Sequence, residues 1–254
     1  MTDQHIYGLH AVAALINNPQ RDIKQIFFNQ DRQDQRLLTL LNEIQSKAIP
    51  TVALSATKMA SKFPDIVHQG IVAMVTPMPV FQEKDLPQLI KGTPKPPFIL
   101  ILDGVTDPHN LGACLRSADA AGVDCVIIPK DKSASITPVV SKVACGAAES
   151  IPVIRVTNLV RTMETLKDLG VWLYGAANES EQTLYALDAQ VPIAIVLGAE
   201  GEGLRRLTRE HCDGLFGIPM LGSVSSLNVS VATGISLYEI VRQRILAQPQ
   251  SESK

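Results

Sequence analysis

The sequence predicts an α/β protein in two parts, the second of which is built on a mostly parallel sheet. The length of 254 residues suits one large domain or two small ones, and a hydrophobic content of 46% is enough for packed cores. From Phe98 onward, apolar runs of strand length alternate with segments of helical periodicity. Between residues 76 and 97 lie six of the sixteen prolines, which predict a stiff connector between two domains.

The first 75 residues are expected to form a small α/β domain. Helical spacing of apolar residues predicts three helices: Gly8–Asn18, Gln35–Lys47 and Ala56–Phe63. Short apolar runs between turn residues predict three strands: Ile23–Asn29, Pro50–Leu54 and Gly70–Val75. The histidines here have no partner spacing typical of catalysis or metal binding. This domain is therefore expected to be a binding or scaffolding module and not a catalytic domain.

Residues 98–254 predict the larger domain, with residues 76–97 as the linker. The expected strands are Phe98–Asp103, Cys125–Pro129, Pro152–Val156, Val171–Gly175, Ile193–Leu197 and Leu215–Pro219. The expected helices are Leu111–Ala121, Thr137–Ala148, Asn158–Leu169, Gly203–His211 and Val229–Ala247. Continuous apolar strands between amphipathic helices indicate a parallel sheet covered on both faces. Ligands of such sheets bind outside the carboxyl ends of the strands.

Composition excludes several classes of protein. A net charge of −2 gives no global reason to expect a nucleic-acid partner, so any basic patch must be local. The sequence contains no apolar run long enough to span a membrane, and its first residues do not form a signal peptide. The four cysteines lack any Cys-x-x-Cys pairing, which favours free thiols in a reducing cytoplasm over a metal site.

Two loops of the larger domain carry polar residues at strand ends. After the strand that ends at Asp103, Asn110 is expected to cap the next helix, and Arg116 follows among small and apolar residues. An arginine in this setting either extends to solvent or points at an anion. The second loop has glycines spaced G-x-x-G-x-G from Gly198, the wrong order for a dinucleotide site, and Glu200 between them can hydrogen-bond inward.

A third stretch joins an apolar strand end at Ile218 to a helix after Asn228, through a loop of small residues. Asn228 is expected to cap that helix, because its side-chain oxygen can accept an otherwise unpaired amide of the first turn. The helix has apolar residues at roughly helical spacing, which predict one buried face. They are Val231, Ile235, Tyr238, Ile240, Val241 and Ile245.

Together the three stretches resemble the three motifs of the SpoU branch of the SPOUT RNA methyltransferases. They read Asp-Gly-Val-x-Asp-Pro-x-Asn-x-Gly-x-x-x-Arg-Ser-Ala, Leu-Gly-Ala-Glu-Gly-x-Gly and Ile-Pro-Met-x-Gly-x-x-x-Ser-Leu-Asn-Val-Ser-x-Ala, in that order, within residues 98 to about 247. The first domain, which begins Ile6-Tyr7-Gly8-Leu9-His10, resembles the ribosomal-protein-like RNA-binding domain found in some members. Domain order and length most resemble members that methylate the ribose of a guanosine in bacterial 23S rRNA.

The resemblance implies a deep trefoil knot in the second domain, S-adenosylmethionine as cofactor, and a homodimer with its sites near the interface. It implies a catalytic cluster of Asn110, Arg116, Glu200, Ser226 and Asn228. It also implies cofactor binding by Leu197, Gly198, Gly201, Ile218, Met220 and Leu227. The family proposal makes the arginine the base, but arginine holds its proton above a pH of about 12. The alternatives are that Arg116 binds an RNA phosphate and orients the 2′-hydroxyl, or that Glu200 is the base.

Other functions stay open at this stage. Relatives act on tRNA or on other rRNA sites, and a non-catalytic RNA-binding protein of the same fold is a further alternative. An oxidoreductase would fit the sheet but not the order of the glycines. A serine hydrolase would need a Gly-x-Ser-x-Gly turn, which the sequence lacks.

Overall fold

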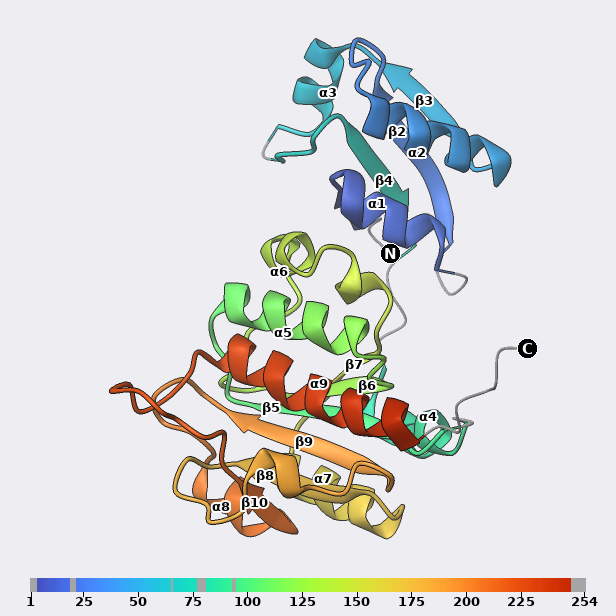
Figure 1. The fold of residues 1–254 in the computed structure, drawn as a ribbon. Helices are drawn as coiled ribbons and strands as arrows, with labels where there is room; N and C mark the ends of the chain where they lie inside the picture. Colours follow the sequence, from blue (N-terminus) through green and yellow to red (C-terminus); the bar gives the residue numbers. More distant parts are fainter. Residues whose placement is uncertain (1–3, 19–21, 65, 77–80, 93–94, 248–254) are drawn as a thin grey trace, which may run out of the picture. The chain divides into compact units, whose positions relative to one another are not determined.

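The computed structural model describes residues 4–18, 22–64, 66–76, 81–92 and 95–247. The chain forms two compact units, residues 1–79 with 136–150 and residues 80–135 with 151–254 (Figure 1). Each unit has its own sheet. No helix among the described residues is both long and apolar enough to cross a membrane.

The first unit is a four-stranded mixed sheet with helices on both faces. Its strands are β1 (Gln4–Tyr7), β2 (Ile23–Asn29), β3 (Thr51–Leu54) and β4 (Ile71–Val75), in the order β1-β4-β2-β3. Its helices are α1 (Leu9–Ile16), α2 (Gln35–Ser46), α3 (Ala56–Lys62), α6 (Pro138–Val143) and the short 3₁₀ turn η2 (Ala147–Glu149). Buried residues of α1 and α2 share one core with the sheet, whereas α3 contributes Met59 to a second core with Phe27 and Val72.

The second unit is built on six parallel strands in the order β10-β8-β9-β5-β6-β7. The strands are β5 (Phe98–Asp103), β6 (Cys125–Pro129), β7 (Val153–Val156), β8 (Trp172–Ala176), β9 (Ile193–Gly198) and β10 (Gly214–Phe216). The α-helices are α4 (Leu86–Lys91), α5 (Pro108–Ala120), α7 (Leu159–Asp168), α8 (Arg206–Glu210) and α9 (Val229–Ala247). Two 3₁₀ turns, η1 (Glu83–Asp85) and η3 (Leu184–Ala186), complete it.

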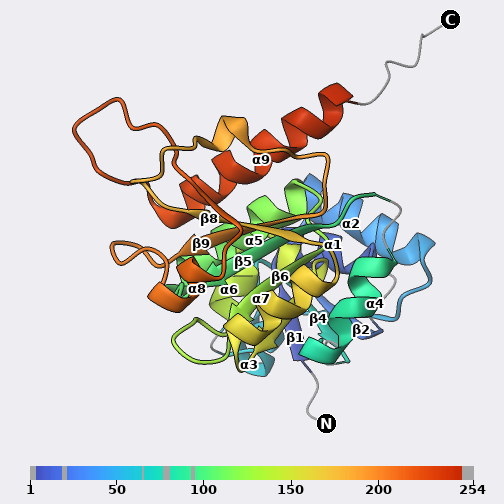
Figure 2. The same cartoon turned by 90° about the horizontal axis from the view of Figure 1, so that it is seen from below.

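Helices cover both faces of this sheet, as continuous apolar strands require. Figures 1 and 2 show α5 and α9 side by side over one face, with α7 and α8 on the other. Small residues allow α5 and α9 to approach closely, and the Cys114 Sγ lies 3.2 Å from the Thr233 Oγ1. Burial raises the pKa of the Cys114 thiol to about 11, so the thiol keeps its proton at neutral pH. Thr233 donates its own proton to the Val229 carbonyl, which leaves Cys114 as the donor to Thr233.

The predicted fold class is confirmed, and the differences are local. The helix expected over Thr137–Ala148 ends at Val143, because Cys145 and Gly146 have φ angles of +52° and +100°. The strand expected over Leu215–Pro219 is only Gly214–Phe216. Residues 83–91 of the expected linker are helical, and Leu86 and Ile90 pack into the core of the second unit. The domain boundaries and the trefoil knot stay predictions.

The prediction for the buried face of α9 is wrong in part. Val231, Tyr238 and Ile245 are 49%, 51% and 61% exposed. Ile240 is buried as predicted, and the buried face also carries Leu237 and two small polar residues, Thr233 and Ser236, that fit against neighbouring elements. The expected periodicity therefore marks a second, outward-facing apolar strip at a spacing of seven residues.

Arg244 fastens the end of α9 to the beginning of the sheet. Its guanidinium donates hydrogen bonds to the carbonyls of Pro96, Pro97, Ala189 and Val191 at distances from 2.8 to 3.2 Å. It also lies 5.0 Å from the centroid of the Phe98 ring. One side chain thus joins α9 to the segments that precede β5 and β9.

We predict that Arg244→Met destabilises the second unit by about 2–4 kcal/mol, since four carbonyls lose a charged donor. Urea unfolding followed by the fluorescence of Trp172, the single tryptophan, reports on this unit. Arg206→Met is the matched control, because Arg206 makes an exposed i,i+4 ion pair with Glu210 and should cost less than about 1 kcal/mol. Equal losses in the two variants would contradict the anchoring role.

Candidate active site

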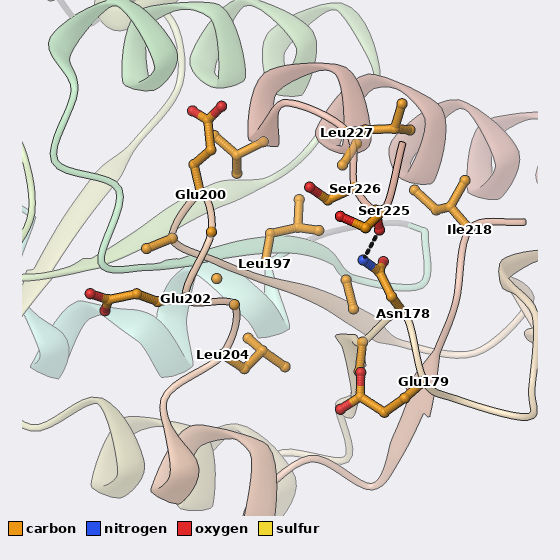
Figure 3. A pocket seen from close by; sticks show the side chains of 18 of the residues that line it. Asn178, Glu179, Leu197, Glu200, Glu202, Leu204, Ile218, Ser225, Ser226 and Leu227 are labelled. Atoms are coloured by element: carbon orange, nitrogen blue, oxygen red, sulfur yellow. Dashed lines mark hydrogen bonds between the residues drawn. The ribbon is translucent and has the colours of Figure 1, made fainter. Parts of the chain in front are cut away.

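A cavity of about 320 Å³ lies at the carboxyl ends of β8 and β9 (Figure 3). Three segments form its walls: residues 176–179 after β8, residues 197–204 around the end of β9, and residues 216–227 before α9. This is the edge at which parallel sheets bind their ligands. The cavity therefore stands where the sequence predicts a site.

The glycine-rich loop after β9 brings bare backbone to the cavity. Ala199 and Gly203 exchange two backbone hydrogen bonds of 3.1 and 2.9 Å, which close the loop into a tight turn. Gly201 and Gly203 have φ angles of +81° and +70°. A Cβ on Gly198 would lie 2.0 Å from the carbonyl carbon of Gly203, so no other residue fits there. The glycines thus let the tight turn close on itself and leave its backbone open to a ligand.

Three of the predicted catalytic residues form a hydrogen-bonded cluster. The Asn110 Nδ2 donates to the Glu200 Oε2 at 3.1 Å. The Asn228 Nδ2 donates to the Asn110 Oδ1 at 3.0 Å and to the same Glu200 oxygen at 3.4 Å. Two amides thus hold one carboxylate oxygen. Asn110 is 118 residues from Asn228 and 90 residues from Glu200 in the sequence, so the cluster depends on the fold.

The two asparagines reach the cluster from the first turns of α5 and α9. The expected capping by Asn228 is confirmed, because its Oδ1 accepts from the backbone amide of Ser230 at 2.9 Å. The capping expected of Asn110 is wrong. Asp107 caps α5 by accepting from the His109 amide, and Pro108 takes the first helical position, where its missing N–H costs nothing. Asn110 is therefore inside the helix, and its side chain is available to Glu200.

The structure also brings the other expected residues of the three loops to the cavity. Those that line it are Leu197, Gly198, Gly201, Ile218, Met220, Ser226 and Leu227, together with Glu200. Figure 3 shows Leu197, Ser226 and Leu227 around the same space, with Glu200 nearby. Their roles in catalysis or in binding stay proposals.

Arg116 lies apart from this cluster. It is on α5, six residues after Asn110, and its side chain is exposed. It does not line the cavity. Six residues turn an α-helix by about 600°, so Arg116 faces a different side of α5 from Asn110. The resemblance implies that Arg116 belongs to the catalytic cluster, but within one chain Arg116 does not line the cavity.

Sequence reasoning missed the buried pair that holds the glycine-rich loop. The carboxylate of Asp103, which is fully buried at the end of β5, accepts from the Arg205 backbone amide at 3.1 Å and from its Nε at 2.6 Å. The Arg205 Nη2 also donates to Asp103. An aspartate that ends a wholly apolar strand was the available signal, since buried carboxylates are almost always paired.

Two further contacts at the cavity were also missed. The Asn178 Nδ2 donates to the Ser225 carbonyl at 2.7 Å and so links the loop after β8 to the loop before α9 (Figure 3). Glu179 pairs with Arg209, and this hydrogen bond lowers the pKa of Glu179 from its usual value. Neither contact follows a sequence spacing, because each joins the loop after β8 to a segment that meets it only in the folded sheet.

The cavity has an acidic rim over an apolar floor. Of the charged side chains that the described structure places around it, three are carboxylates, on Glu179, Glu200 and Glu202, and one is the guanidinium of Arg209. Leu197, Ile218 and Leu227 supply apolar surface. Such a site favours a flat ligand that carries positive charge and disfavours one that carries a pyrophosphate. Among the described residues, no three histidines, cysteines or acids are grouped so as to hold a metal ion.

We predict that Asp103→Asn loosens the turn at residues 199–205, since a neutral amide cannot satisfy three donors of one arginine. The backbone amides of residues 199–205 should exchange their hydrogens faster than in the parent. The free energy of unfolding should fall by about 2–4 kcal/mol. Asp107→Asn is the control, because asparagine caps helices as well as aspartate does. Unchanged exchange in Asp103→Asn would show that the pair does not hold the turn.

Comparison with known proteins agrees with this geometry. The family described as SpoU rRNA methylase matches residues 97–238, and the family described as RNA 2′-O ribose methyltransferase substrate binding matches residues 5–80. The chain is 56% identical over 239 residues to the 23S rRNA (guanosine-2′-O-)-methyltransferase RlmB of Escherichia coli K12, covering 94% of this chain and 98% of that one. It is 55% identical over 241 residues to the RlmB of Pseudomonas putida, covering 95% and 97%.

Solved structures show the same fold. The SpoU methyltransferase AviRb of Streptomyces viridochromogenes, in complex with the cofactor AdoMet, superimposes with a TM-score of 0.77 at 24% identity, over 96% of this chain and 92% of that one. One family model matches more than half of the chain, and the curated relatives extend over nearly all of it. On these findings the chain belongs to the SpoU rRNA methylase family.

Proposed function

We propose that this protein transfers a methyl group from S-adenosylmethionine to the ribose 2′-hydroxyl of a guanosine in 23S rRNA. The observation that carries the proposal is the Asn110–Glu200–Asn228 cluster beside a cavity lined by bare glycine backbone. High identity over the full length to two 23S rRNA (guanosine-2′-O-)-methyltransferases supports the substrate.

The residues present fit the cofactor. Its sulfonium is positively charged, and the rim of the cavity carries three carboxylates against one guanidinium. Its adenosine part suits the apolar side chains of Leu197, Ile218 and Leu227 and the exposed backbone around Gly198 and Gly201. Met220 completes the proposed binding set. When bound, S-adenosylmethionine supplies an electrophilic methyl group on a good leaving group.

The remaining chemistry belongs to the side chains, which must position a hydroxyl and take its proton. Glu200 suits the second task, because it lines the cavity and because Asn110 and Asn228 hold its carboxylate in place through Oε2. Ser226, at the rim, suits the first task as a hydrogen-bonding group. Arg116, exposed on α5, suits the binding of an RNA phosphate through its planar guanidinium.

A homodimer is part of the proposal. The exposed strip of Val231, Tyr238 and Ile245 on α9 is an apolar surface that a second copy would cover. Leu221 and Val224, in the loop before α9, are 99% and 62% exposed. A partner on this strip lies next to α5, the helix that packs against α9 and carries Arg116. This would explain why one chain leaves Arg116 outside the cavity.

Three further features complete the proposal. Residues 1–75 act as the substrate RNA-binding domain, residues 76–97 link it, and residues 98–254 catalyse; the substrate-binding family match over residues 5–80 supports this division. A trefoil knot in the catalytic domain is supported by the match of residues 97–238 to the SpoU rRNA methylase family. A cytoplasmic location is supported by the proposed rRNA substrate and by four cysteines, none of which forms a disulfide among the described residues.

The direct test is methyl transfer from labelled S-adenosylmethionine. The full chain is incubated with 23S rRNA, 16S rRNA and total tRNA, and the labelled nucleotide is mapped. Label on the 2′-oxygen of a guanosine in 23S rRNA is the expected result. Label in tRNA alone would favour a tRNA-modifying relative, and binding of RNA without label would favour a non-catalytic member.

We predict that Glu200→Gln lowers kcat by about 10²- to 10⁴-fold, the usual contribution of a general base. The amide keeps the size of the side chain but removes one rim carboxylate, so the Kd for S-adenosylmethionine, measured by calorimetry, should change no more than in Glu202→Gln, which removes another. Glu202→Gln is the control, since Glu202 lines the cavity but is outside the cluster. Loss of RNA binding with kcat retained would assign Glu200 to binding instead.

We predict that Arg116→Lys loses at least about tenfold in kcat/KM, because lysine keeps the charge but not the bidentate geometry. Cofactor affinity should stay at the parent value, since Arg116 is outside the cavity. A near-normal rate would count against any role for the guanidinium.

A further inference from the structure

A second cavity, of about 650 Å³, lies at the carboxyl ends of β6 and β7. We propose that this cavity, here called the arginine groove, binds the sugar–phosphate backbone of the RNA beside the methylated nucleotide. Residues after β6, residues 157–161 at the start of α7 and residues 205–208 at the start of α8 line it. The inference rests on the proposed function, because it assumes an RNA substrate.

The lining of the groove is basic in a chain of net negative charge. Three arginines, at positions 161, 205 and 206, face one acid, Asp131. Lys130 and Lys132, next to Asp131, are exposed as well. This is the local basic patch that the overall composition neither showed nor excluded. It contrasts with the acidic rim of the cofactor cavity.

The three arginines differ in how much of their charge is available. Arg205 is committed to the buried carboxylate of Asp103, so its charge is largely balanced. Arg206 pairs with Glu210, but their side chains are 75% and 50% exposed, and such a surface pair is worth little. Arg161 is exposed at the start of α7. Arg161 and Arg206 are therefore the two cations that an anionic ligand would recruit.

The groove is a close neighbour of the proposed active site. Leu204 and Arg209 line the cofactor cavity, whereas Arg205 and Arg206 line the groove. The short helix α8 is thus the wall between them, and an α-helix is about 10 Å across. Both cavities open at the same edge of one parallel sheet. An RNA strand with its ribose at the first cavity would reach the groove with the phosphates of a neighbouring nucleotide.

The chemistry of the groove favours phosphate over bases. A guanidinium matches two phosphate oxygens at once. Among the described residues that line the groove there is no aromatic side chain on which a base could stack. Contacts to phosphate position a strand without reading its sequence. The groove would therefore add affinity and register, and leave the choice of nucleotide to other surfaces.

The test is the double variant Arg161→Ala/Arg206→Ala in the full chain, with an RNA fragment that the parent methylates. The Kd for the RNA should rise about tenfold or more, and the slope of log Kd against log salt should fall by about 1 to 2. The kcat at saturating RNA and the Kd for S-adenosylmethionine should match the parent. The matched control is Lys84→Ala/Lys91→Ala, which removes two exposed cations from η1 and α4 of the same unit.

Each other outcome overturns the proposal. An unchanged Kd and salt slope would show that the groove does not contact RNA. An equal loss in the lysine control would assign the effect to net charge. A fall in kcat or in cofactor affinity with RNA binding intact would assign the arginines to the first site. Failure of the proposed function would be seen separately, as an absence of methyl transfer by the parent chain. The salt dependence of RNA binding can be measured in that case too, so the two failures are distinguishable.

Discussion

The second unit depends on one buried carboxylate. Asp103 ends β5, near the centre of the sheet, and is fully buried, so its charge is tolerable only because Arg205 satisfies it from the far end of the glycine-rich loop. That contact fixes where the loop ends, and the Ala199–Gly203 hydrogen bonds fix how it turns. Glu200 lies within the fixed segment. The position of the proposed base therefore follows from a pair that is outside the Asn110–Glu200–Asn228 cluster.

Arg205, one member of this pair, stands at the start of α8, and this helix lies between two cavities of opposite charge. On one side of α8 the cavity has three carboxylates on its rim, which suits a cationic cofactor. On the other side the groove is lined by arginines, which suits a polyanion. The charge of Arg205 itself is balanced by the carboxylate of Asp103. Two neighbouring cavities thus carry lining charges of opposite sign in a chain whose overall charge stays close to zero.

Much of the fold could be predicted from sequence, because the strands of a parallel sheet are almost purely apolar and their spacing leaves few alternatives. The motif residues came from the resemblance of three stretches to a known family, and their roles stay predictions. Contacts between distant loops could not be predicted: neither Asp103–Arg205 nor Asn178–Ser225 has a spacing that signals it. The prediction for the buried face of α9 is wrong in part for a different reason. Val231, Tyr238 and Ile245 have the periodicity of a buried face, yet periodicity does not tell whether the chain itself or another surface covers them.

The anchor at Arg244 bears on the order in which the protein matures. It joins α9 to Pro96, 148 residues earlier, and Asn228 at the head of the same helix completes the Glu200 cluster. Contacts of such long range form slowly, because the intervening loop must close first. On the ribosome, β5 to β9 emerge well before α9 does. A nascent chain can therefore build most of its sheet, yet it completes the Asn110–Glu200–Asn228 cluster only once α9 has been synthesised and docked.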